Sequence, residues 1–141
     1  MRVLFLCSGN YYRSRFAEAV FNFHAARRGL AARAFSRGLA THLAADLPGK
    51  ISPHTIRALA ERGIPLTCTG ACPAQVGNTD LATAQHIVAV KEAEHRVLLA
   101  QLHPGWEERV EYWQVHDLDA GTPEEILPGL ERQVLALLNQ F

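Results

Sequence analysis

One short segment near the start of the chain limits the possible folds most strongly. Residues 3–6 read Val-Leu-Phe-Leu, an unbroken apolar run of strand length, and the polar turn Ser8-Gly9-Asn10 follows directly. Such a run without polar alternation is typical of a strand buried on both faces of a parallel sheet. Apolar residues then recur at helical spacing through about residue 28. The segment therefore predicts a strand, a tight loop and a helix in succession.

The rest of the chain continues to alternate strand and helix patterns. Strands that alternate with helices predict parallel pairing, right-handed crossovers and a sheet covered on both sides. Ligands of such sheets lie at the carboxyl ends of the strands, where the loop after Leu6, Ser36 and the stretch after Val115 are expected to meet. Further strands are expected over residues 32–36, 86–90 and 110–115, and further helices over residues 53–62, 79–84, 92–102 and 123–140.

Two of these helices show an apolar face that predicts their core contacts. In the helix over residues 92–102 the expected core residues are Ala93, Val97, Leu98 and Leu102. In the helix over residues 123–140 they are Leu127, Leu130, Val134, Leu137 and Leu138.

Composition narrows the class of protein. The 14 basic and 14 acidic residues balance, which disfavours a nucleic-acid partner, and 48% of the residues are hydrophobic, as in ordinary globular proteins. A single domain over residues 1–141 is expected. No apolar run approaches the roughly 20 residues of a membrane span, and the start does not resemble a signal peptide. Three cysteines, an odd number, favour a reduced, cytoplasmic setting.

The loop after the first strand carries the chemistry. Cys7 ends the apolar run, and Arg13 follows six positions later at the start of the predicted helix. Successive backbone N–H groups of a tight loop and the helix N-terminus form an anion site, and arginine binds two phosphate oxygens at once. A cysteine in that field is favoured as the nucleophilic thiolate. The expected phosphate-binding residues are Ser8, Gly9, Asn10, Tyr11, Tyr12, Arg13 and Ser14.

Individual loop residues have further predicted roles. Gly9 allows the backbone to approach a ligand closely, and Asn10 tolerates a left-handed conformation and can tie the loop together. Ser14 can cap the helix or donate a hydrogen bond to the Cys7 sulfur, and the two roles are compatible. The segment lacks the pattern and the lysine of a Walker loop.

The segment Cys7-Ser8-Gly9-Asn10-Tyr11-Tyr12-Arg13-Ser14, followed by Ala17-Glu18, resembles the low-molecular-weight protein tyrosine phosphatases, whose loop reads C-x-G-N-x-C-R-S-P. The resemblance covers nearly the whole chain. It continues in Ser36-Arg37-Gly38, in the helix that Ser52-Pro53 opens, and in the strand that ends at His116-Asp117.

The resemblance implies a four-stranded parallel sheet in a flavodoxin-like three-layer sandwich, and a cytoplasmic protein tyrosine phosphatase. It makes Cys7 the nucleophile, Arg13 the phosphate clamp and Asp117 the general acid, with Asn10, Ser14 and Ser36 as supporting residues. The substrate is expected to be a phosphorylated protein or a small aryl phosphate, hydrolysed through a phosphocysteine without metal or cofactor. No nucleic-acid or membrane partner is implied, and the chain is expected to be a monomer or a weak homodimer.

The sequence also departs from the family pattern. Tyr12 replaces the second loop cysteine, which removes a disulfide brake on the nucleophile. Arg15 replaces the proline after R-S and is expected to add charge near the mouth of the site. The acid loop reads Asp117-Leu118-Asp119 instead of D-P-aromatic, so an aromatic wall for phosphotyrosine is expected from Tyr11 and Tyr12.

Several alternatives stay open at this point. Asp119 is an alternative general acid, although the strand pattern favours Asp117. An arsenate reductase on the same fold and a non-catalytic phosphate- or oxyanion-binding protein are alternative functions. Cys68 and Cys72 are interpreted as ordinary thiols, since a zinc site needs about four ligands.

Overall fold

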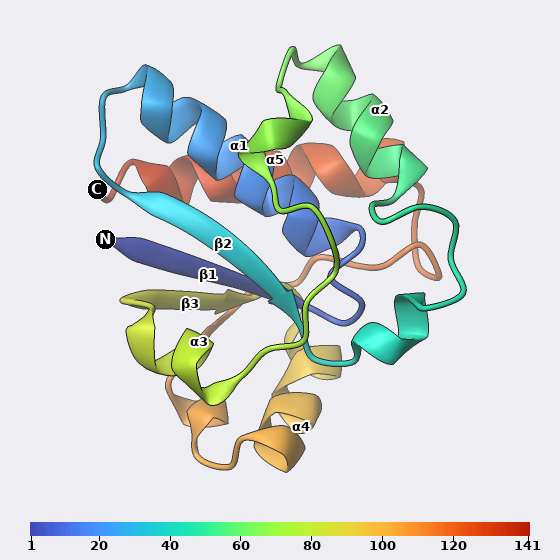
Figure 1. The fold of residues 1–141 in the computed structure, drawn as a ribbon, viewed down its shortest axis with the longest axis vertical. Coiled ribbons are helices and arrows are strands. Elements are labelled where there is room, and N and C mark those ends of the chain that lie inside the picture. The colour runs from blue at the N-terminus through green and yellow to red at the C-terminus, as the bar shows by residue number, and fades with distance from the viewer.

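The computed structural model describes residues 1–141 and has a four-stranded parallel sheet at its centre (Figure 1). Its strands lie in the order β2-β1-β3-β4, and every neighbouring pair is parallel. This order is that of a flavodoxin-like sheet, so the predicted fold class is confirmed. The strands are β1 (Arg2–Cys7), β2 (Arg33–Gly38), β3 (His86–Ala89) and β4 (Glu111–Tyr112).

Helices cover both faces of this sheet (Figure 1). One face carries α1 (Arg13–Arg27), α2 (Pro53–Glu61) and α5 (Pro123–Leu138), and the other carries α3 (Asn78–Thr83) and α4 (Glu92–Leu102). Short 3-10 turns cover Thr41–Ala44, Leu66–Cys68 and Trp106–Glu108. None of the helices has the length and apolarity to cross a membrane.

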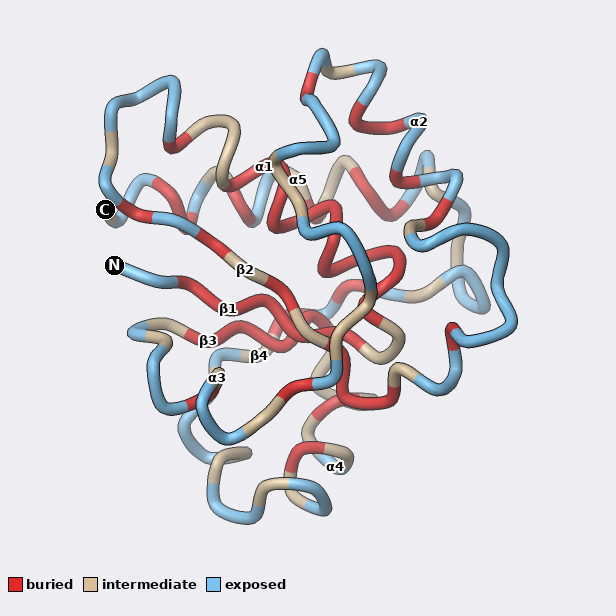
Figure 2. Tube along the Cα trace, in the orientation of Figure 1, coloured by how far each residue is buried: buried red, intermediate tan, exposed pale blue.

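The central strand β1 divides the core into two parts. Val3, Phe5 and Cys7 point to the face that α1 and α5 cover, whereas Leu4 and Leu6 point to the opposite face. This alternation is the period of two that a strand imposes on its side chains. All five residues are buried, and Figure 2 shows β1 buried along nearly its whole length. The unbroken apolar run is thus explained by burial on both faces.

Strand β4 is shorter than the expected residues 110–115. The ladder ends early because β3 stops at Ala89 and the chain then turns into α4. Residues beyond β4 still follow this edge, since the Trp113 amide donates to the Ala89 carbonyl at 2.9 Å and the Val115 amide to the Val90 carbonyl at 2.7 Å. These two bonds carry the chain to Asp117 at the carboxyl end of the sheet.

The predicted core face of α4 is wrong. Val97 and Leu102 are 58% and 46% exposed, and the helix instead buries His95 and Leu99, one turn apart. Tertiary contacts decide this choice, because the imidazole of His95 finds hydrogen-bond partners inside the protein. In contrast, the apolar face predicted for α5 is confirmed, since all five of its residues are buried.

The boundaries of α2, α3 and β2 lie close to those that the sequence predicts. Ser52 caps α2 by accepting a hydrogen bond from the His54 amide at 3.2 Å, as expected. Helix α3 begins one residue before the expected Thr79, because the Asp80 carboxylate accepts from the Gly77 amide at 2.9 Å. Strand β2 begins one residue later than expected and continues to Gly38, where it pairs with Cys7.

Replacing Leu130 tests the larger part of the core. Leu130 on α5 is fully buried, so Leu130→Ala is expected to lower the free energy of unfolding by about 2–5 kcal/mol through lost contacts and a cavity. The exposed Val97 on α4 is the matched control, and Val97→Ala should change stability by less than about 0.5 kcal/mol. Urea denaturation measures both, and equal losses would contradict this assignment of the core.

Candidate active site

Three segments far apart in the sequence meet at the carboxyl end of the sheet. The loop after β1, residues 43–54 from the first 3-10 turn to the start of α2, and residues 117–119 enclose a cavity of about 450 Å³. Its lining includes Cys7, Tyr12, Arg13 and Asp117. Ser36 lies beneath the loop, on β2. The structure therefore brings together the residues that the sequence singles out.

Cys7 is a buried thiol in the lining of this cavity, with 2% of the residue exposed. Its Sγ lies 2.9 Å from the Ser14 hydroxyl. Of the two predicted roles of Ser14, the helix cap is wrong, because α1 begins at Arg13 and no side chain caps it. The Ser14 hydroxyl faces the sulfur instead, and this contact can stabilise a thiolate.

Asn10 holds the loop in shape. Its φ of 53° is the only positive value at a non-glycine residue, as expected for an asparagine that tolerates the left-handed region. Its Nδ2 donates to the hydroxyls of Ser14 and Ser36, both at 2.9 Å, and its Oδ1 accepts from the Ala74 amide at 2.9 Å. One side chain thus joins the loop to β2 and to the segment before α3.

Gly38 allows this loop to approach β2. A Cβ atom at Gly38 would lie 2.7 Å from the Ser8 carbonyl oxygen and 2.7 Å from Cγ2 of Thr41. The resemblance to the family motif at Ser36-Arg37-Gly38 therefore has a steric reason, since a side chain at this position would push the loop away.

The Arg13 guanidinium lies at the centre of the polar contacts and is 2% exposed. Its Nη1 donates to the Val115 carbonyl at 3.0 Å, and its Nη2 donates to Oε2 of Glu94 at 3.0 Å. Asp117 Oδ2 is 3.4 Å from the same Nη2. Burial by itself would lower the pKa of Arg13, but the neighbouring Cys7, Asp117 and Glu94 raise it above the usual value. Arg13 therefore stays charged.

Glu94 and His95 were missed by the sequence reasoning. His95 Nδ1 accepts from the Lys91 amide at 3.1 Å, so its proton lies on Nε2, which is 3.0 Å from the Ser8 hydroxyl. Ser8 in turn donates to Glu94 Oε2 at 3.2 Å, and Glu94 binds Arg13. The only available signal was their position in the first turn of a helix that follows a central strand, at the expected ligand edge.

The pKa values of this pair follow from its surroundings. Burial by itself would raise the pKa of Glu94, but the hydrogen bond and charge of Arg13 lower it below the usual value. Burial and the Arg13 charge lower the pKa of His95 from 6.5 to about 4. Above about pH 5 a charged carboxylate and a neutral imidazole thus support the phosphate clamp.

A second buried network lies under the loop. The Ser36 hydroxyl donates to Glu18 Oε1 at 2.6 Å, and the Thr69 hydroxyl donates to the same oxygen at 2.8 Å. Burial raises the pKa of Glu18, while these hydrogen bonds oppose the rise. The hydrogen-bonded chain Cys7, Ser14, Asn10, Ser36, Glu18 is continuous, so the support of the nucleophile passes from the start of α1 through β2 and returns to the second turn of α1.

The sequence predicts Arg15 near the mouth of the site, and the structure shows that this prediction is wrong. It is 1% exposed, and its guanidinium donates to the Asn10 carbonyl at 3.3 Å, the Lys50 carbonyl at 2.9 Å and the Thr69 hydroxyl at 2.8 Å. It also donates to the Gly70 carbonyl. Backbone carbonyls left free by three loops can satisfy a buried guanidinium, and for this reason Arg15 joins those loops instead of reaching solvent.

The two candidate acids differ in their contacts. The Asp117 side chain is 43% exposed and pairs with Arg13, whereas Asp119 lines the cavity without an ion pair. The proximity of Asp117 to the predicted phosphate clamp favours it as the acid, in agreement with the strand pattern.

Other candidate residues are not assembled into a site. Cys68 is half-buried and Cys72 exposed, and both are free thiols.

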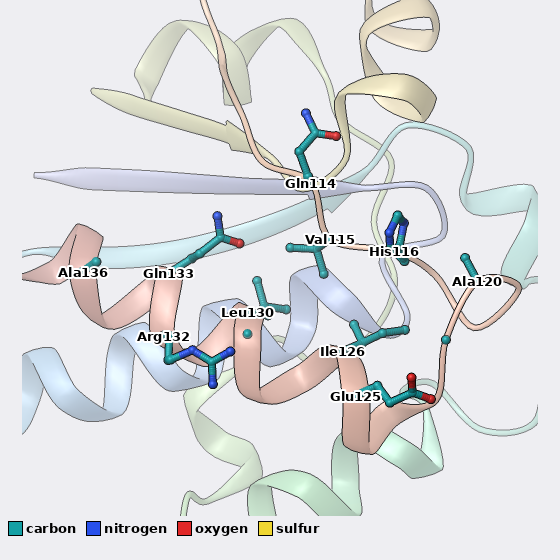
Figure 3. A pocket seen from close by; sticks show the side chains of 12 residues that line it. Gln114, Val115, His116, Ala120, Glu125, Ile126, Leu130, Arg132, Gln133 and Ala136 are labelled. Atoms are coloured by element: carbon teal, nitrogen blue, oxygen red, sulfur yellow. The ribbon is translucent and has the colours of Figure 1, made fainter.

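A second cavity, of about 600 Å³, lies between α5 and the residues that precede Asp117 (Figure 3). Figure 3 shows Val115 and Leu130 facing this hollow, whose lining does not include Cys7 or Arg13.

Comparison with known proteins identifies the family. A model of the low molecular weight phosphotyrosine protein phosphatases matches residues 2–128. The chain belongs to this family. The predicted family and its enzyme class, a cysteine-dependent phosphatase, are thereby confirmed.

Individual relatives agree with the family match. The protein-arginine-phosphatase of Bacillus subtilis (strain 168) is 41% identical over 66 residues, a match that spans 47% of this chain and 41% of the relative. A YwlE mutant from Bacillus subtilis is 26% identical, with a TM-score of 0.79 over 99% of this chain and 97% of that one. A thioredoxin-dependent arsenate reductase of Corynebacterium glutamicum, 20% identical with a TM-score of 0.69 over 99% and 60% of the two chains, shares the fold.

The buried His95 makes stability depend on pH. Between about pH 6.5 and pH 4 the unfolded chain binds a proton at this residue that the folded chain does not. The free energy of unfolding of the native protein should therefore fall as the pH decreases through this window, relative to a His95→Gln variant. The expected slope of the difference is at most about 1.4 kcal/mol per pH unit. Urea denaturation at several pH values measures it, and a difference independent of pH would contradict the neutral imidazole.

Proposed function

We propose that this protein hydrolyses phosphate esters on phosphorylated proteins through a phosphocysteine at Cys7, as a protein tyrosine phosphatase. One observation carries the proposal: the buried Cys7 thiol contacts a hydroxyl and lies in one cavity with Arg13 and Asp117. A loop of backbone N–H groups and an arginine fork can hold the phosphate dianion over the sulfur, and the same groups stabilise the transition state.

The first step transfers the phosphoryl group to the enzyme. The Cys7 thiolate forms the S–P bond while the bond from phosphorus to the leaving oxygen breaks. Asp117 gives its proton to that oxygen, so that a neutral alcohol or phenol departs. The Ser14 hydroxyl at 2.9 Å from Sγ stabilises the charged form of the sulfur before the attack.

The second step regenerates the thiolate. Asp117, now a carboxylate, takes a proton from water as its oxygen attacks phosphorus. The S–P bond breaks, inorganic phosphate leaves and the electron pair returns to sulfur. The Ser14 hydroxyl again stabilises the departing thiolate. Arg13, held by the Val115 carbonyl and by Glu94, keeps its place in both steps.

Phosphoarginine is a second candidate substrate, and Asp119 favours it. This carboxylate lines the cavity beside Asp117 and has no cationic partner. A departing arginine is cationic, so an additional carboxylate stabilises it, whereas the same charge disfavours acidic phosphotyrosine peptides. The relative named protein-arginine-phosphatase, and a solved YwlE arginine phosphatase that is 25% identical with a TM-score of 0.80 over 99% and 95% of the chains, support this candidate.

Replacing the nucleophile tests the proposed reaction. Cys7→Ser is expected to lower hydrolysis of p-nitrophenyl phosphate by at least about a thousandfold, because a serine hydroxyl is not ionised at neutral pH. The variant should still bind inorganic phosphate in calorimetric titration.

The exposed Cys72 is the matched control for this experiment, and Cys72→Ser should keep full activity. A Cys7→Ser variant with native turnover would overturn the nucleophile assignment. Phosphate binding without turnover by the native protein would favour the binding protein, and thioredoxin oxidation driven by arsenate would favour the reductase.

The substrate class is tested with Asp119→Asn and two peptides of one sequence, carrying phosphotyrosine or phosphoarginine. If phosphoarginine is the substrate, the substitution should lower kcat/KM for that peptide about fivefold, because the departing cation loses a carboxylate partner. It should raise or maintain kcat/KM for the phosphotyrosine peptide. A native preference for phosphotyrosine together with equal effects of the substitution would reject the second candidate.

A further inference from the structure

The hydroxyl of Tyr12 has no hydrogen-bond partner in the protein. The chain has three tyrosines, and Tyr11 and Tyr112 donate to the carbonyls of Pro48 and Glu107. Tyr12 Oη is buried and makes no hydrogen bond to any other group of the protein. Tyr12 is also the residue that replaces the second loop cysteine of the family motif, so this hydroxyl is a feature of this chain.

An unpartnered buried hydroxyl costs stability. Tyr12 is 6% exposed, and an unsatisfied buried polar group costs about 1–3 kcal/mol. Phenylalanine would fill the same space without that cost. Almost all buried polar groups in folded proteins are hydrogen-bonded, so an exception at the edge of a catalytic cavity indicates a partner that arrives during the reaction.

The surroundings of Tyr12 identify that partner. Tyr12 lines the same cavity as Cys7 and Asp117, and its ring packs edge-on against His54 at 6.3 Å between centroids. Burial first, and the Asp117 carboxylate second, raise the pKa of Tyr12 from 10.0 to about 12. The hydroxyl therefore keeps its proton and can act as a donor, and Asp117 is the carboxylate whose charge contributes most to this shift.

Phosphate binding changes the contacts of Asp117. In the structure Asp117 Oδ2 is 3.4 Å from Nη2 of Arg13, the guanidinium that is proposed to clamp the phosphate. A bound phosphate dianion competes for this nitrogen, whose other contact is Glu94. Asp117 then loses its cationic partner, while the hydroxyl of Tyr12, which lines the same cavity, is a free donor.

We infer that, once substrate occupies Arg13, the Tyr12 hydroxyl donates a hydrogen bond to the Asp117 carboxyl group and positions it as general acid. This role rests on the proposed phosphatase function. Tyr12 binds the Asp117 oxygen that carries no proton, and the other oxygen directs its proton to the leaving group. The proton of Tyr12 stays on Tyr12 in both steps, so Tyr12 is a positioning residue.

Removing the hydroxyl tests this role. Tyr12→Phe is expected to lower kcat about tenfold for phenyl phosphate, a poor leaving group that needs the acid, and less than about twofold for 2,4-dinitrophenyl phosphate. KM should not change. Because a donor to the charged form is lost, the pKa of Asp117 in the complex should rise and the alkaline limb of kcat should move to higher pH. Equal losses with both leaving groups would indicate a packing role and overturn the inference.

The titratable and charged groups around this pair are the same in the native protein and in Tyr12→Phe, so they do not produce the difference. They are Cys7, Tyr11, Arg13, His54 and Asp119 of the cavity lining, Glu124 at the start of α5, and Glu94, which binds Arg13.

Two further variants separate positioning from structure. On an Asp117→Asn background, Tyr12→Phe should add no further loss of kcat, and additive losses would contradict action through Asp117. Tyr112→Phe, outside the site, is the matched control and should keep native kcat. In urea denaturation Tyr12→Phe should raise the free energy of unfolding, and Tyr112→Phe should lower it, since only Tyr112 gives up a hydrogen bond.

A last measurement does not depend on turnover. In Cys7→Ser protein saturated with inorganic phosphate, the pKa of Asp117 is followed by carbon-13 NMR with and without the added Tyr12→Phe substitution. The hydroxyl should make the pKa of Asp117 lower by at least about half a pH unit. Equal values would overturn the inference, whatever the kinetics show. If the native protein hydrolyses no phosphate ester, the proposed function fails, and this titration still decides whether Tyr12 binds Asp117.

Discussion

The buried charge of Arg13 is the constraint on which the site depends. A guanidinium removed from water is costly unless it is paired, and here the Val115 carbonyl, Glu94 and Asp117 are the partners of its two Nη atoms. These partners come from the edge of the sheet, from α4 and from the acid loop. Their positions are therefore linked through one side chain, which is also the group best suited to bind a phosphate.

The loop that carries the nucleophile is held by a network of neutral and charged hydrogen-bonding groups. Asn10 fixes its left-handed turn, Ser36 and Glu18 continue the network into the core, and Arg15 joins it to the loops near Lys50 and Gly70. A loop supported in this way keeps its amides oriented before substrate arrives, so binding requires little reorganisation. The acid loop is the more exposed part of the site, since the Asp117 side chain is 43% exposed, and the nucleophile loop beside the cavity contributes the unused donor of Tyr12.

Local patterns predicted much of this architecture. The apolar run in β1, the cap at Ser52 and the apolar face of α5 are properties of short segments, and the structure confirms each one. The motif from Cys7 to Ser14 predicted the family for the same reason, because a phosphate loop is built from consecutive residues. The errors have a different origin. The face of α4, the length of β4 and the burial of Arg15 depend on partners that are distant in the sequence.

The amino-acid sequence was sufficient for the strand-loop-helix unit, the parallel α/β class and the pairing of Cys7 with Arg13 in one loop, since these follow from neighbouring residues and their spacing. The choice of Asp117 came from the resemblance to the family. Folding added Glu94, His95 and Glu18 to the site, and made Tyr12 Oη a buried hydroxyl without a partner. The burial of a polar group and the identity of its partners are set by packing between segments that lie up to 102 residues apart, as Arg13 and Val115 do. Such contacts leave no periodic or local trace in the sequence.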